Sequence, residues 1–102
     1  MMTHNVYFWL KEGISDADKA AFEDGLRGLF AISEIDSGFF AKPASTPERP
    51  VTDHSFTYSL NLTFKSVADH DIYQDHPEHH RFVDNCKGYW QQVKVYDSEA
   101  IE

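Results

Sequence analysis

The chain has 102 residues, enough for one hydrophobic core, so we predict a single domain over residues 1–102. Its formal net charge of −8, from 17 acidic against 9 basic residues, argues against nucleic-acid binding because an anionic surface repels phosphate. No apolar run approaches the ~20 residues of a membrane-spanning helix, the N-terminus carries no secretory signal, and the single cysteine, Cys86, cannot form an intramolecular disulfide. We therefore expect a cytoplasmic protein with no membrane contact.

The first patterned segment, residues 4–10, is apolar on both faces. Val6 and Phe8 alternate with Tyr7 and Trp9, whereas a strand with one face in water carries polar residues at every second position. Each face of this predicted strand must therefore be covered. We expect the chain's own helices to cover one face, and a second copy of the chain to cover the face of Tyr7 and Trp9.

A helix and a short strand follow. Ser15 is a typical helix N-cap, and the spacing of Phe22 and Leu26 fits the buried face of an amphipathic helix. Residues 35–42 predict a second strand, and the prolines of residues 43–50 predict a loop.

The clearest strand pattern covers residues 56–64, where apolar and polar side chains alternate without exception. The polar face would leave part of a buried dimer interface hydrated. We expect the apolar set to face the core; it consists of Phe56, Tyr58, Leu60, Leu62 and Phe64.

The remaining segments complete a βαββαβ order. Ser66 predicts the start of a helix that ends near Asp75, Pro77 suits the first turn of another helical segment, and residues 90–96 form a last strand. This order predicts an α+β fold of the ferredoxin-like class, with the helices on one face of a four-stranded antiparallel sheet. The face of the sheet without helices would be uncovered in a monomer, which again indicates a homodimer.

Imidazole and phenol groups suggest an acid–base site between the sheet and the helices. His4 shares a strand face with Val6, while His70 and Tyr73 share a helix face with Val67. His79 lies two residues after Pro77, and a position near a helix N-terminus lowers the pKa of an imidazole and favours its neutral form.

We predict a catalytic set of His79, Tyr73 and His4. His79 would act as the general acid or base, Tyr73 would donate a hydrogen bond to a carbonyl oxygen as it gains charge, and His4 would orient the substrate or Tyr73. Taken singly, each imidazole is more often a capping or hydrogen-bonded residue at the edge of a core.

A metal site is a further alternative. His70 and His80 could converge with the other imidazoles, and neutral imidazole binds zinc, copper or nickel. No acidic residue is clearly placed to join them, and Cys86 is remote in the pattern. We therefore predict no metal and no other cofactor.

Four segments resemble the stress-responsive A/B barrel (Dabb) family, and the resemblance covers nearly the whole chain. They are His4-x-Val6, Phe64-x-Ser66, Tyr73-x-x-His76-Pro77-x-His79 and Trp90-x-x-Val93-x-Val95-x-Asp97. The resemblance implies a ferredoxin-like protomer that forms a dimeric α+β barrel. A plant member of the family is a polyketide cyclase that performs an aldol condensation without a metal. Its catalytic histidine and tyrosine, and the histidine that opens its first strand, fall on His79, Tyr73 and His4.

The same resemblance implies a pocket wall, with departures that change the ligand. An aromatic pair on the family enzyme's first helix appears here as Glu23 and Leu26, a pocket isoleucine as His70, and a pocket valine as His80. These changes favour a smaller or more polar ligand. The substrate-binding residues that we expect are Val6, Phe22, Leu60, Leu62, His70, Phe82 and Trp90.

These observations predict a homodimeric protein with a small-molecule pocket, acting as a metal-free acid–base lyase or cyclase on a carbonyl compound. The alternative is a non-catalytic, stress-linked dimer with a structural or ligand-binding role, whose pocket is filled by its own side chains.

Overall fold

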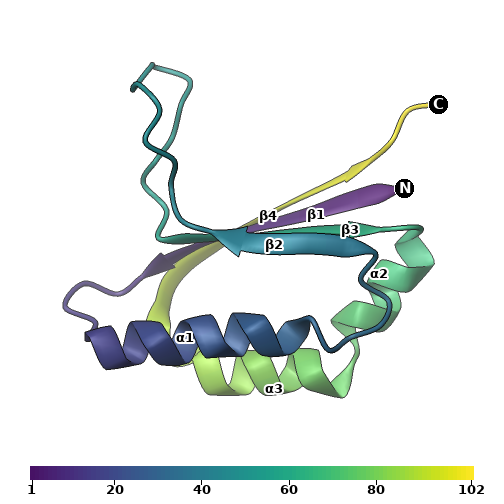
Figure 1. Cartoon of the computed structure of the whole chain (residues 1–102), viewed down its shortest axis with the longest axis horizontal. Coiled ribbons are helices and arrows are strands. Elements are labelled where there is room, and N and C mark those ends of the chain that lie inside the picture. Colours follow the sequence, from purple (N-terminus) through teal and green to yellow (C-terminus); the bar gives the residue numbers. More distant parts are fainter.

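A four-stranded antiparallel sheet with three helices against one face forms the protein (Figure 1). The computed structural model describes residues 1–102. Its elements, in chain order, are β1 (Met2–Leu10), α1 (Asp16–Leu29), β2 (Ser37–Ala41), β3 (Tyr58–Phe64), α2 (Val67–Gln74), α3 (Pro77–Cys86), a 3₁₀ turn (Lys87–Tyr89) and β4 (Trp90–Glu99). The predicted ferredoxin-like α+β class is confirmed, with the second helical region divided into α2 and α3.

The strand order β2-β3-β1-β4 makes β1 a central strand. In its register, Val6 lies opposite both Leu60 and Val95, and two residues earlier His4 lies opposite Leu62 and Asp97. Opposed residues share a face of the sheet. The helix-facing side of β1 therefore changes from apolar at Val6 to polar at His4, next to a carboxylate from β4.

Side-chain caps fix where each helix begins. The hydroxyls of Ser15 and Ser66 accept hydrogen bonds from backbone N–H groups three residues ahead, at 3.0 and 3.1 Å, as the sequence predicts. The third helix is capped by His76, whose Nδ1 accepts from the Glu78 N–H at 3.0 Å, with Pro77 at the first helical position. His76 is therefore a structural residue that limits α3.

The core lies between the sheet and the helices. Phe8 of β1 contacts Phe22 of α1 and Phe82 of α3, with ring centroids 5.1 and 6.0 Å away. Phe22 also stacks on Tyr58 of β3 at 5.3 Å. Edge and offset contacts of this kind add to the free energy gained by burying the rings.

Two predicted orientations were wrong. Phe56 precedes β3, because the chain bends at Thr57, and its ring packs against Tyr7 on the sheet face opposite the helices. The alternation of residues 58–64 thus does not extend back to Phe56. Val67, in the first turn of α2, is 41% exposed instead of facing the sheet with His70 and Tyr73.

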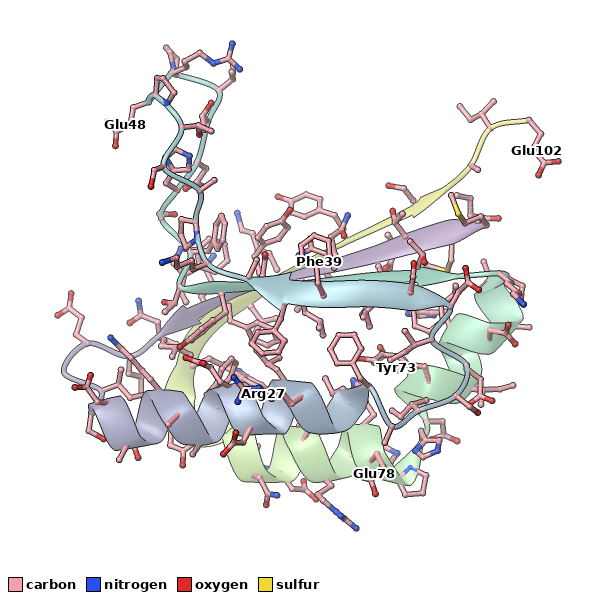
Figure 2. All side chains as sticks on the ribbon, viewed as in Figure 1. Arg27, Phe39, Glu48, Tyr73, Glu78 and Glu102 are labelled. Atoms are coloured by element: carbon pink, nitrogen blue, oxygen red, sulfur yellow. The ribbon has the colours of Figure 1, made fainter.

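The segment between β2 and β3 extends from the sheet face that the helices leave open (Figure 1). Trp9 holds it near the sheet through a hydrogen bond from its indole N–H to the Ser55 hydroxyl, at 3.0 Å. Phe39 also projects from this face (Figure 2) and is 62% exposed. An aromatic surface is thus left on the open side of the sheet.

No helix in the structure is both long and apolar enough to cross a membrane.

The contact between α1 and α3 yields a test with an internal control. A Cβ added at Gly25 would lie 2.6 Å from Cys86 Sγ and 3.2 Å from Phe82, whereas one added at Gly28 would meet nothing within 4 Å. Gly25→Ala should therefore lower the free energy of unfolding by about 1–3 kcal/mol through overpacking. Gly28→Ala should raise it by up to about 1 kcal/mol through helix propensity.

Chemical denaturation of the two variants measures both effects. Equal stability changes would show that α3 can move away from α1 without cost.

Candidate functional site

A cavity of about 390 Å³ lies between the sheet and the helices α2 and α3. Its wall brings together side chains from β1, β3, α2, α3 and β4, and most of them are apolar. The residues singled out from the sequence that line it are His4, Val6, Leu60, His70, Tyr73, His79, Phe82 and Trp90. Phe22 and Leu62 do not line it, because both are fully buried in the core.

Tyr73 and His79 form the centre of this wall. Tyr73 projects from α2 into the space between the helices and the sheet (Figure 2) and is 1% exposed. Its ring meets the His79 ring edge-on, with centroids 5.0 Å apart. Burial raises the pKa of the Tyr73 phenol, so this hydroxyl stays protonated near neutral pH and can act as a hydrogen-bond donor.

His79 is held in its neutral form. Burial is the main reason that the pKa of its imidazole is lowered, and the nearby His80, His4 and His70 lower it further. The direction agrees with the sequence prediction, although the prediction attributed it to the helix N-terminus. A neutral imidazole beside a protonated phenol is a suitable pair for moving a proton and stabilising an oxyanion.

His4 and Asp97 form a second pair. His4 Nδ1 and Asp97 Oδ1 are 2.5 Å apart, and His4 is 5% exposed. The pKa of His4 is lowered because burial outweighs the opposing effect of Asp97. A neutral His4 therefore donates its Nδ1–H to the carboxylate, which leaves Nε2 as an acceptor.

Asp97 was missed as a site residue by the sequence analysis. The signal was present, because Val93, Val95 and Asp97 alternate along β4 as Phe8, Val6 and His4 do along β1. His4 and Asp97 are the polar residues at the ends of these two series, and the antiparallel register of β1 and β4 places them side by side.

The other imidazoles have different environments. His70 lies on the cavity wall, its ring centroid 4.7 Å from that of His4. Its Nδ1 lies 3.1 Å from an Asp71 carboxylate oxygen, while its Nε2 is buried without a partner. His80 faces solvent beside Asp75, contrary to the pocket position that the resemblance implied. Convergence of four imidazoles is therefore excluded.

Tyr7 and Trp9 lie on the opposite face of the sheet. With Phe39, Phe56 and Tyr96 they line a second hollow of about 480 Å³ between the sheet and the β2–β3 segment. This hollow shares no residue with the cavity that contains Tyr73 and His79.

The fold and cavity define an α+β ferredoxin-like protein with a histidine- and tyrosine-lined pocket. The family model of the stress responsive A/B barrel domain (Dabb) matches residues 2–100. The chain therefore belongs to this family. A comparison with curated proteins found no match.

Solved structures show the same fold. A protein from Arabidopsis thaliana is 19% identical, with a TM-score of 0.79 over 100% of this chain and 97% of its own. A Dabb family protein with a ferredoxin-like fold from Mesorhizobium loti is 21% identical, with a TM-score of 0.79 over 99% and 97%. The hydroxynitrile lyase of Passiflora edulis is 20% identical, with a TM-score of 0.80 over 99% and 94%.

The lowered pKa of His79 has a consequence for stability. Its folded pKa lies below the ordinary value of 6.5, so below that pH the unfolded chain binds more protons than the folded one and stability falls as pH falls. Above it both states are neutral at His79 and the effect vanishes. His79→Gln removes this term, so its free energy of unfolding should decline less than that of the wild type between about pH 7 and 5.

His54→Gln is the matched control, because His54 lies in the segment between β2 and β3 and is not among the groups that lower the pKa of His79. This variant should keep the wild-type dependence of stability on pH. Denaturation midpoints across this pH range measure the difference. Parallel curves for the wild type and His79→Gln would contradict a buried, neutral His79.

Proposed function

We propose that the chain is a homodimeric enzyme that performs metal-free acid–base chemistry, of the lyase or cyclase type, on a small carbonyl compound. The observation that carries the proposal is the pairing of Tyr73 with His79, at 5.0 Å between ring centroids, in the wall of an open cavity. The open volume argues against the alternative in which the protein's own side chains fill the pocket.

The proposed chemistry assigns one role to each group. Neutral His79 accepts a proton from a C–H or O–H group next to the reacting carbonyl carbon, and returns it from the imidazolium when the product forms. The protonated Tyr73 hydroxyl donates a hydrogen bond to the oxygen on which negative charge develops. His4, whose Nδ1 is held by Asp97, presents Nε2 as a hydrogen-bond acceptor to the substrate.

The cavity wall indicates the kind of substrate. No lysine or arginine lines the cavity, and much of its wall is apolar, including Leu60, Val93 and Trp90. A volume of about 390 Å³ lies near the lower end of the range for ligand sites. These features favour a small, uncharged carbonyl compound.

The hydroxynitrile lyase of similar fold indicates which carbonyl reactions to test first. At 20% identity the similarity shows a shared fold, and a fold alone does not carry an activity. The proposal therefore depends on the His79–Tyr73 pair, and the lyase guides the choice of compounds to test.

The dimer is proposed from the open face of the sheet. Tyr96 and Phe39 are 57% and 62% exposed there, beside the half-buried Tyr7 and Trp9. Aromatic residues gathered on one face are typical of protein–protein interfaces. Similar ferredoxin-like proteins from Thermobifida fusca and Bacteroides fragilis are described as dimeric.

Trp9→Ala should weaken self-association at least ~10-fold, since a central interface tryptophan commonly contributes that much. Sedimentation velocity over a concentration series measures the shift toward monomer. Ile72→Ala is the control, because Ile72 is 52% exposed on α2, on the helical side. A sedimentation profile for Trp9→Ala identical to the wild type would remove Trp9 from the interface.

The acid–base roles can be tested with a panel of hydroxynitriles and aldol-type carbonyl compounds. His79→Ala should lower turnover by about 10²–10⁴, and Tyr73→Phe by about 10²–10³, with the dimer intact. His80→Ala should turn over at the wild-type rate, because His80 lies outside the cavity. A wild-type protein that binds these compounds without turnover would instead support the non-catalytic alternative.

A further inference from the structure

We infer that His4, His70 and Asp97 form a binding site for one divalent transition-metal ion of the zinc type, at the polar end of the cavity. Each residue offers a ligand atom, and the three atoms lie within 4.8 Å of one another. They come from β1, α2 and β4, three elements whose relative positions the fold fixes. Such a site goes beyond the acid–base function, which depends on His79 and Tyr73.

The environment of His70 is the first support. Its Nδ1 faces the Asp71 carboxylate at 3.1 Å, and a carboxylate only accepts hydrogen bonds, so Nδ1 carries the hydrogen and Nε2 keeps its lone pair. Metal-binding histidines usually donate their second ring N–H to a carboxylate in this way. The arrangement leaves Nε2 as the atom available to a metal.

The buried, unpartnered state of this Nε2 is the second support. Water approaches a ring nitrogen to about 2.9 Å, whereas zinc binds at about 2.0–2.1 Å. An ion can therefore reach a nitrogen to which a water molecule has no access. Buried polar atoms in proteins nearly always have a partner, and an ion shared with His4 would supply one.

The contact between His4 and Asp97 provides the other two ligands. Nδ1 and Oδ1 stand 2.5 Å apart with a hydrogen between them. If the imidazole hydrogen moves to Nε2, a cation can take its place at Nδ1, with the two ligand atoms about 3.3 Å apart in a tetrahedral site. The Asp97 side chain is 46% exposed, so it has room for this small movement.

The local charge favours a cation over an anion. A depression of about 240 Å³ shares His70 and Asp97 with the main cavity, and Asp71 and Glu99 also line it. Neither hollow is lined by lysine or arginine, and the chain carries a net charge of −8. Clefts lined by one sign of charge concentrate the opposite ion, so this depression is an entry route for a divalent cation.

The ligand set selects the kind of metal. Two imidazoles and one carboxylate suit zinc, cobalt or iron(II) better than magnesium or calcium, which prefer oxygen ligands. Three protein ligands leave one position open.

Titration of chelator-treated full-length protein with Zn²⁺ tests the site. Calorimetry should show saturable binding of about one ion per chain, and Co²⁺ should give a visible absorption band of a site with nitrogen ligands. His70→Ala and Asp97→Asn should each weaken Zn²⁺ binding more than ~10-fold, and Asp71→Asn by about 10–100-fold. Thermal unfolding of each variant without metal checks that the fold is retained.

His80→Ala is the matched control, since His80 also lies beside a carboxylate, Asp75 at 3.4 Å, but is exposed to solvent. It should keep wild-type affinity. His79→Ala should also bind Zn²⁺ with wild-type affinity, while its metal-free form loses turnover relative to the metal-free wild type. The two measurements separate failure of this site from failure of the acid–base function. The inference would be overturned if the wild type showed no saturable Zn²⁺ binding, or if His70→Ala bound Zn²⁺ with wild-type affinity.

Discussion

The pairing of β1 with β3 and β4 is the constraint on which the rest of the structure depends. The central strand β1 has a neighbour on each edge, and it carries apolar or aromatic side chains on both faces. Val6 and Phe8 pack under the helices, while Tyr7 and Trp9 face the open side. The same register that pairs Val6 with Leu60 and Val95 pairs His4 with Asp97. One strand thus connects the core, the site and the face proposed for the dimer.

The cavity keeps the imidazoles of His79 and His4 and the phenol of Tyr73 uncharged because these groups are buried, and no lysine or arginine lines its wall. Because burial lowers the pKa of His79 and of His4, and raises that of Tyr73, all three groups are uncharged near neutral pH. A neutral base and a neutral acid in contact are the state from which proton transfer to and from a carbonyl compound can begin. An arginine or lysine in the wall would instead favour anionic ligands.

His4 belongs to both proposed activities, and this links them. In the acid–base role its Nδ1–H is held by Asp97 and its Nε2 faces the substrate, whereas metal binding at Nδ1 moves that hydrogen to Nε2. The two roles therefore exclude each other on one chain, although neither requires the other. His79 and Tyr73 are not metal ligands, so variants at those positions separate the two activities.

The sequence by itself determined the order of elements, the helix caps at Ser15 and Ser66, and the ferredoxin-like class, because these depend on spacing and side-chain type within a few residues. Through the periods of strand and helix it also indicated that His4, His70 and Tyr73 face the space between the sheet and the helices. His79 was added from its position after Pro77 and from the family resemblance. Only the tertiary structure decided which of them meet. Asp97 reaches His4 through strand register across 93 positions of the chain. His80 faces solvent because α3 packs against the rest of the protein through the face that carries Phe82 and Cys86. Phe56 changes face because the chain bends before β3. Pairings of this kind depend on how elements pack together, and no local period of the sequence encodes them.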